Sequence, residues 1–179
     1  MTARAARAGG VASSPARLDA WLRELDLTPV SGAEREGVSS RDVLLHGRRR
    51  RGIRMTLIVA PGLGLVAWVH YAPALGDAFR KTYRQLLKWN DELPFVKFAL
   101  SADDDLVLMA EVAAADLDAD TVGRSVARLV AVCDLLHPET ARLLGAGASG
   151  SLGVSREPAP SPLLDRYAAD LAELAPTET

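Results

Sequence analysis

Apolar residues recur along this chain with two different periods, which predict helices in some segments and strands in others. Leu18, Trp21, Leu22 and Leu25 follow the i, i+3, i+4, i+7 spacing of a helix with one buried face. We therefore expect a short amphipathic helix over residues 15–25. A loop rich in Gly, Ser and Glu is expected to follow it.

The middle of the chain alternates apolar and polar residues with the period of two that is typical of strands. The arginine run RRRRG and the pair Pro-Gly separate the alternating stretches, and both are typical of turns. Together they predict a meander of three antiparallel strands. The expected strands cover residues 42–46, 53–60 and 65–71.

In the second half of the chain, the spacing of apolar residues predicts a helix, then a β-hairpin, then further helices. The expected elements are a helix over 77–90, strands over 95–100 and 106–112, a helix from about 116 to 136 and a short helix to Leu144. The fold class is thus α/β, of the α+β kind, in the order α-βββ-α-ββ-α. We expect one domain over 15–144, in which helices pack on an antiparallel sheet of about five strands.

The two ends of the chain differ in composition from this domain. Residues 1–14 are rich in Ala, Gly and Ser and are expected to form a disordered lead-in. Residues 145–162, rich in Gly, Ala, Ser and Pro, predict a flexible linker. Residues 163–179 form an amphipathic segment whose helix is too short to be stable alone. It either docks on the domain or waits for a partner.

The expected helix near residues 116–136 is apolar over more than one face. Val122, Val126 and Val130 lie on one stripe, and Val132 and Leu135 extend the apolar surface around the helix. Such breadth predicts burial on two sides, with a second subunit as one candidate cover.

One long stretch without charge must be distinguished from a membrane span. Met55–Gly76 contains no Lys, Arg, Asp or Glu over 22 residues, a length that could cross a bilayer. Pro and Gly residues interrupt the stretch, so two strands joined by a turn explain it better. We therefore expect no membrane segment.

Charge and cysteine content restrict the classes of function. The net charge is −2 and the pI about 5.9, which predicts no general attraction to nucleic acid or membranes. Residues 41–88 carry ten Lys or Arg against two acids, whereas 89–139 carry three against eleven. These halves either face each other within the domain or give it two oppositely charged sides. The lone Cys133 excludes an internal disulfide and favours a reducing, cytoplasmic location.

The chain lacks the motifs that carry catalysis or hold cofactors. His46, His70 and His137 lie on unrelated elements, without the spacing that a metal site needs. We expect no cofactor, no metal and no enzymatic activity. The alternative is an enzyme of unrecognised type with a cleft near His70 and Trp89.

Five arginines near one expected hairpin are the most distinctive charged feature. Their guanidinium groups could bind an acidic protein partner or phosphate. Nucleic-acid or anion binding by this hairpin is the second alternative, although few aromatics and an acidic pI make nucleic acid a poor match. The simpler interpretation is a solvated hairpin tip. The candidate residues are Arg48, Arg49, Arg50, Arg51 and Arg54.

Asn90 is a polar residue on the apolar stripe of the expected helix over 77–90. A side-chain amide there can bond backbone groups that a helix end and a strand start leave unpaired. We therefore expect Asn90 to act as a structural clamp and not as a catalyst.

The block LLKWNDELPFVKFALSADDDLVLMAEV (86–112) resembles the YbjN family, in which a helix ends in an asparagine before a Lys-Phe strand and an acidic turn. VLLHGRRRRGIRMTLIV and VCDLLHPE reinforce the resemblance, which spans about residues 15–144. It implies a bacterial protein with the α/β sandwich of type III secretion chaperones, which often pair as dimers. The family is labelled a sensory transduction regulator, and no catalytic residues carry over. We therefore expect a non-enzymatic, chaperone-like or regulatory protein-binding module, acting as a homodimer on an unknown protein partner.

Overall fold

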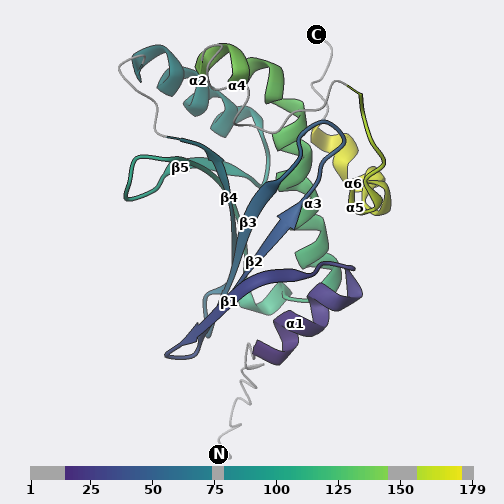
Figure 1. Cartoon of the computed structure of the whole chain (residues 1–179). Coiled ribbons are helices and arrows are strands. Elements are labelled where there is room, and N and C mark those ends of the chain that lie inside the picture. Colours follow the sequence, from purple (N-terminus) through teal and green to yellow (C-terminus); the bar gives the residue numbers. More distant parts are fainter. Residues whose placement is uncertain (1–14, 74–78, 145–156, 175–179) are drawn as a thin grey trace, which may run out of the picture.

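The computed structural model describes residues 15–73, 79–144 and 157–174 and forms a mixed α+β fold (Figure 1). Its sheet contains six antiparallel strands in the order β1-β2-β3-β4-β6-β5. The strands are β1 (Pro29–Arg35), β2 (Val38–Leu45), β3 (Ile53–Ala60), β4 (Gly64–Ala72), β5 (Lys97–Leu100) and β6 (Leu106–Val112). The helices are α1 (Pro15–Glu24), α2 (Phe79–Glu92), α3 (Ala119–Leu135), α4 (His137–Leu144), α5 (Pro162–Arg166) and α6 (Ala168–Leu171), with short 3₁₀ turns η1 (Ala114–Asp116) and η3 (Ala172–Leu174).

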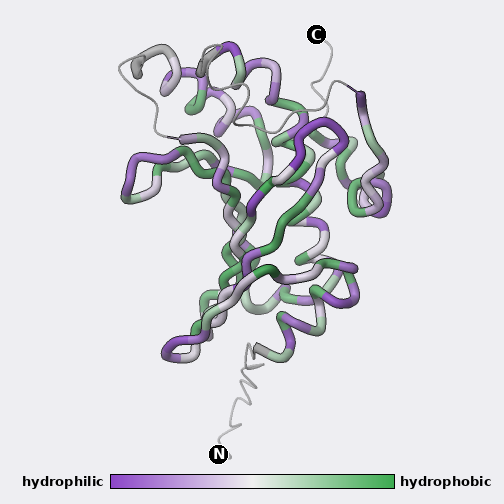
Figure 2. Tube along the Cα trace, in the orientation of Figure 1, coloured by the Kyte–Doolittle hydropathy of each residue, from purple (hydrophilic) through white to green (hydrophobic). Residues whose placement is uncertain are grey.

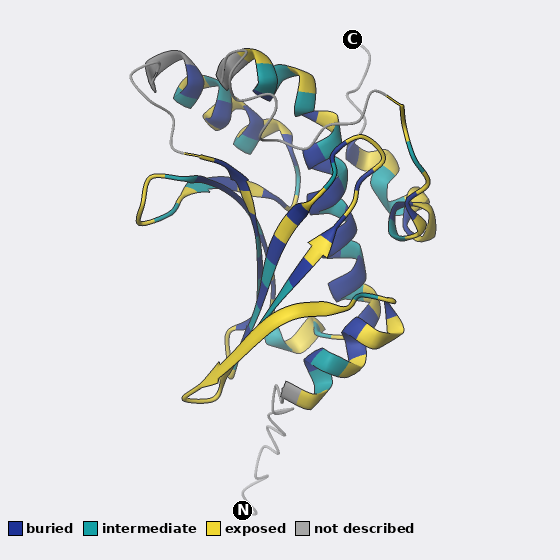
Figure 3. Ribbon diagram, in the orientation of Figure 1, coloured by how far each residue is buried: buried dark blue, intermediate teal, exposed yellow. Residues whose placement is uncertain are grey.

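The α+β class and the antiparallel sheet are as expected, with one strand more than the sequence indicated. The additional strand is β1, which lies where the sequence predicts a polar loop. All seven residues of β1 are exposed, and among the described strands β1 pairs with β2 alone. Figure 3 shows it as a continuous exposed ribbon. A strand that buries neither face shows no alternation, so the sequence pattern could not reveal it.

The central strands direct alternate side chains to two very different environments. On β3, Ile53, Met55, Leu57 and Val59 are at most 1% exposed and face the helices. The intervening residues face the other side of the sheet. The same alternation continues on β4 and β6, and Figure 2 shows the apolar character of these strands. The core therefore lies between one face of the sheet and the helices.

The helix α3 runs across the covered face and is the centre of the core. Asp118 caps it, because its carboxylate accepts a hydrogen bond from the Thr121 backbone N–H at 2.7 Å. Its buried residues include Val122, Val126 and Leu129, all 0% exposed. In Figure 1, α1 and α3 lie on one side of the sheet, and no described helix covers the other side of β2, β3 and β4. We call that side the open face.

The second side of α3 is covered by the chain's own C-terminal part, here called the strap (residues 157–174). Leu164, Tyr167 and Leu174 are buried there. Burial of α3 on two sides is thus observed, but the cover is this segment and not a second subunit. Of the two outcomes open for the terminal segment, the structure has it docked.

Two other expectations fall largely on residues that the structure does not describe. The lead-in (1–14) lies outside the described residues, as does 145–156 of the expected linker. The rest of that linker belongs to the strap, where the Ala159 N–H donates to the Arg48 carbonyl at 2.8 Å.

The uncharged stretch Met55–Gly76 contains most of β3 and all of β4, which pair antiparallel in the sheet. Among the described helices, none combines the length and apolar character that crossing a membrane requires.

Candidate functional site

The arginine turn between β2 and β3 wraps around one carboxylate. Asp134 of α3 accepts hydrogen bonds from the backbone N–H groups of Arg48, Arg49 and Arg50, at 2.5, 3.2 and 2.7 Å. Gly47 is needed at this position, since a Cβ there would lie 2.3 Å from the Asp134 Oδ1. The backbone cradle that could have held an external anion is therefore filled by the protein itself.

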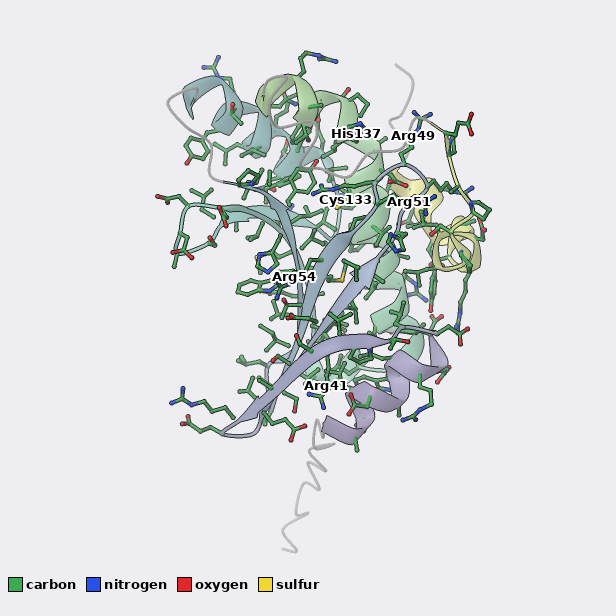
Figure 4. All side chains as sticks on the ribbon, in the orientation of Figure 1. Arg41, Arg49, Arg51, Arg54, Cys133 and His137 are labelled. Carbon is green, nitrogen blue, oxygen red and sulfur yellow. The ribbon has the colours of Figure 1, made fainter. Side chains whose placement is uncertain are left out.

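The five candidate arginines do not form one surface. Arg50 is only 5% exposed, and Arg48 pairs with Asp165 of the strap. Arg54 pairs with Asp42 at 3.0 Å on the open face. Figure 4 shows Arg49 and Arg51 near the turn and the strap, apart from Arg54. Arg50 in particular cannot meet a partner, because its side chain points into the core.

The buried Arg50 side chain packs against Tyr71. Its guanidinium donates to the Tyr71 carbonyl and lies 4.6 Å from the centre of the Tyr71 ring. Burial raises the pKa of the neighbouring Cys133 thiol to about 12, so Cys133 is a packed thiol and not a nucleophile. Burial, together with the positive Arg50, lowers the pKa of His137. These contacts explain Arg50 as a structural residue.

Asn90 bonds the outer edge of β5. Its Nδ2 donates to the Phe98 carbonyl at 3.1 Å, and its Oδ1 accepts from the Phe98 N–H at 2.6 Å. The amide thus makes both hydrogen bonds that a further strand would make with Phe98. The helix continues to Glu92, so the bonded groups belong to the strand edge and not to the helix end. The clamp itself remains a prediction, which a stability measurement can test.

The structure separates His70 and Trp89, the two residues near which an enzymatic cleft was considered. Trp89 is 5% exposed and packs against Phe98, with ring centres 5.6 Å apart. His70 is exposed and lies on the open face, because it alternates with the buried Val69 and Tyr71. Within the described ranges, no group of three or more His, Cys, Asp or Glu is placed to hold a metal ion.

The open face carries the most distinctive surface of the described molecule. An apolar hollow of about 300 Å³ crosses β3, β4, β6 and β5. At its rim, Leu63 and Leu100 are 78% and 41% exposed. The Trp68 indole N–H is buried and finds no hydrogen-bond acceptor among the described residues. The hollow is lined by Ile58, Ala60, Leu63, Gly64, Val66, Trp68, Ala99, Leu100, Val107, Met109 and Glu111.

A polar network borders this hollow on the β2 side. The Asp42 carboxylate accepts hydrogen bonds from Ser31 and Thr56, both at 2.7 Å, and from Arg54 at 3.0 Å. The Ser31 and Thr56 hydroxyls, helped by the positive Arg54, lower the pKa of Asp42 to about 2. Asp42 is therefore ionised over the physiological pH range.

The sequence contained a signal for this surface. Ile58, Val66, Trp68, Val107 and Met109 are apolar although they alternate with core-facing residues. Strands that are apolar on both sides are typical of sheets covered on both faces. Here only one face has a described helix over it, so the second apolar face is the missed candidate.

A protein-family model and a solved structure are similar to parts of this chain. A family model described as "Putative bacterial sensory transduction regulator", YbjN, matches residues 14–141. A chain from the heterodimeric ExoU-SpcU complex of the Pseudomonas aeruginosa type III secretion system is similar in structure, with a TM-score of 0.49 and 22% identity, over 72% of this chain and 98% of that one. No curated protein matches. Since the family model covers well over half of its residues, this chain belongs to the YbjN family.

Proposed function

We propose that this chain is a non-enzymatic protein-binding module with a regulatory role, and that it pairs with a second copy through the open face of its sheet. The observation that carries the proposal is the apolar hollow on that face. Water is a poor solvent for such a surface, and covering apolar area contributes about 25 cal/mol per Å². Contiguous apolar surface on an uncovered sheet face is a candidate protein interface.

The arrangement of charge favours a second copy as the occupant. One row of paired residues crosses the face from Asp42 through Thr56, Trp68 and Met109 to Lys97. A two-fold axis parallel to β4 would bring Asp42 of one copy opposite Lys97 of the other. A face with an acid at one end and a base at the other complements itself.

The covered side of the molecule offers less for such pairing. The broad apolar surface of α3 is already occupied by the strap, where Leu164 and Tyr167 are buried. The open face is therefore the better candidate for a homodimer. The family description as a sensory transduction regulator supports a regulatory role, in which pairing or partner exchange carries the signal.

The two alternatives receive less support from the geometry. An enzyme near His70 and Trp89 would need polar groups that converge, and these two side chains lie on opposite sides of the sheet. Anion binding by the arginine turn would need backbone N–H groups that Asp134 occupies.

A single charge on the open face tests the proposal. Met109→Glu places a carboxylate in the row next to Trp68, where pairing with a second copy would remove it from water. We expect the dimer dissociation constant to rise on the order of 100-fold, which corresponds to about 3 kcal/mol. Light scattering over a dilution series measures the change.

The matched control is Leu87→Glu, which introduces the same charge at a residue of α2 that is 68% exposed. It should leave the dimer intact, and both variants should melt like the parent at concentrations where all are monomers. Equal effects of the two substitutions would reject the open face as the interface. A Met109→Glu variant that still forms the dimer as tightly as the parent would also reject the open face as the interface.

A further inference from the structure

The strap lies on the domain in the way that a bound peptide lies on its receptor. Its apolar anchors Leu164, Tyr167 and Leu174 are 4%, 3% and 7% exposed. Tyr167 packs on α3 at Gly123, and α3 contacts both α5 and α6. The two helices of the strap have five and four residues, and helices this short are unstable in water without such packing.

Acidic residues of the strap meet basic residues of the domain along its length. Asp165 pairs with Arg48, Asp170 with Arg124 at 2.9 Å, and Glu173 with Arg128 at 3.5 Å. All three acids belong to the strap and all three arginines to the domain. The surface is therefore complementary to an acidic segment.

Backbone contacts extend the interface to the arginine turn and α1. The Ser161 hydroxyl donates to the His46 carbonyl at 3.1 Å, and Arg166 donates to the Glu24 carbonyl at 3.2 Å. The Ala159 N–H donates to Arg48. The contacts thus reach over the end of β2, α1 and α3, so the site has defined ends.

A glycine near the start of α3 makes room for the strap. A Cβ on Gly123 would lie 2.1 Å from the Tyr167 hydroxyl oxygen and 2.5 Å from Leu25 Cδ2. Glycine inside a helix destabilises it by about 0.5–1 kcal/mol relative to alanine. At this position glycine permits the Tyr167 ring to pack directly on the helix.

The ion pairs of the strap add little to its anchoring, because they are partly exposed. The strap is tethered to the domain, which gives it an effective concentration in the millimolar range. It also lies beyond the part of the chain that the family model matches, which ends at residue 141.

We infer that the surface formed by α1, α3 and the arginine turn is a docking site for an acidic amphipathic helical segment of a partner protein, and that the strap is its resident competitor. The partner segment carries Leu and Tyr anchors and carboxylates with the spacing found in the strap. Binding of the partner displaces the strap. The inference concerns the covered side of the molecule and does not depend on pairing through the open face.

The test uses the full chain and a labelled peptide with the sequence of residues 157–174. In the full-length double variant Leu164→Ala, Tyr167→Ala, the tethered strap loses two anchors and competes poorly. We expect this variant to bind the peptide at least about ten-fold more tightly than the parent chain, measured by fluorescence anisotropy. A peptide with Asp165→Asn, Asp170→Asn and Glu173→Gln should bind several-fold more weakly, and more so at low salt.

Gly123→Ala in the double variant is the blocking control, because its Cβ occupies the space that the Tyr167 ring needs. It should abolish the gain in peptide binding. A double variant that is folded by circular dichroism and yet binds the peptide no better than the parent overturns the inference. Binding that is unchanged by Gly123→Ala overturns it as well.

A second experiment covers the case in which the double variant does not fold. A protease site is inserted within residues 145–156 of the otherwise unchanged chain, which is then cleaved after folding. We expect the released strap to exchange with labelled peptide at a measurable rate. A cleaved strap that neither leaves nor exchanges under native conditions contradicts a displaceable competitor. The same exchange is expected in a chain that also carries Met109→Glu, because displacement of the strap does not depend on pairing through the open face.

Discussion

Two polar side chains bond backbone groups that have no backbone partner of their own among the described residues. The Asn90 amide bonds both backbone groups of Phe98 at the edge of β5. The Asp134 carboxylate accepts hydrogen bonds from backbone N–H groups of the arginine turn. The sequence marked Asn90 as unusual, because an amide on an apolar stripe needs a partner. It could not name Phe98, because that pairing depends on how β5 folds back beside α2.

Asn90→Leu keeps the apolar bulk but removes the partner of both Phe98 backbone groups. We expect the free energy of unfolding to fall by about 1–3 kcal/mol. Denaturant unfolding measures the change. Gln85→Leu, which removes an amide from the same helix at a partly exposed position, should change stability by no more than about 0.5 kcal/mol. Parent-like unfolding of the Asn90 variant would show that the amide is not a clamp.

Asp42 provides a test through pH. Its pKa is lowered to about 2 in the folded protein, from an ordinary value of 3.8. A lowered pKa contributes stability that is present above the ordinary value and is lost as the pH falls toward 2. We therefore expect Asp42→Asn to cost about 1–2 kcal/mol at pH 7 and almost nothing near pH 2. A cost that does not change between these pH values would contradict the assigned contacts.

Among the helices and strands, those with a buried face were predicted from the spacing of their apolar residues. β3 spans the predicted residues 53–60, and α3 (Ala119–Leu135) lies within the helix predicted from about 116 to 136. β1 escaped prediction because it buries nothing. The breadth of α3 correctly indicated two buried sides, but periodicity cannot tell whether a cover comes from the same chain or another one.

The arginine turn offers a prediction at this scale. Asp134→Ala removes the acceptor of three backbone N–H groups, so we expect a loss of about 2–4 kcal/mol in stability. Asp165→Ala removes only the exposed pair with Arg48 and should cost less than about 1 kcal/mol. Thermal unfolding of the two variants decides between a structural turn and a solvated hairpin tip. Similar costs would mean that the cradle contributes little.

In the whole molecule, the two sides of the sheet present different surfaces. The covered side holds the strap, and the open face presents an apolar surface with charges of both signs. The sequence revealed the scaffold and the apolar residues of the open face, but not how these residues join into one surface. A surface depends on which residues of separate strands come into register, as Asp42 and Lys97 do at the ends of one row.

Pairing through the open face is tested directly by the mass of the full chain, measured by sedimentation equilibrium at micromolar concentrations and above. The chain has a mass of 19.1 kDa. We predict twice this mass for the parent and for Leu87→Glu, and a single-chain mass for Met109→Glu. A parent chain that stays at 19.1 kDa over the whole concentration range would contradict pairing through the open face.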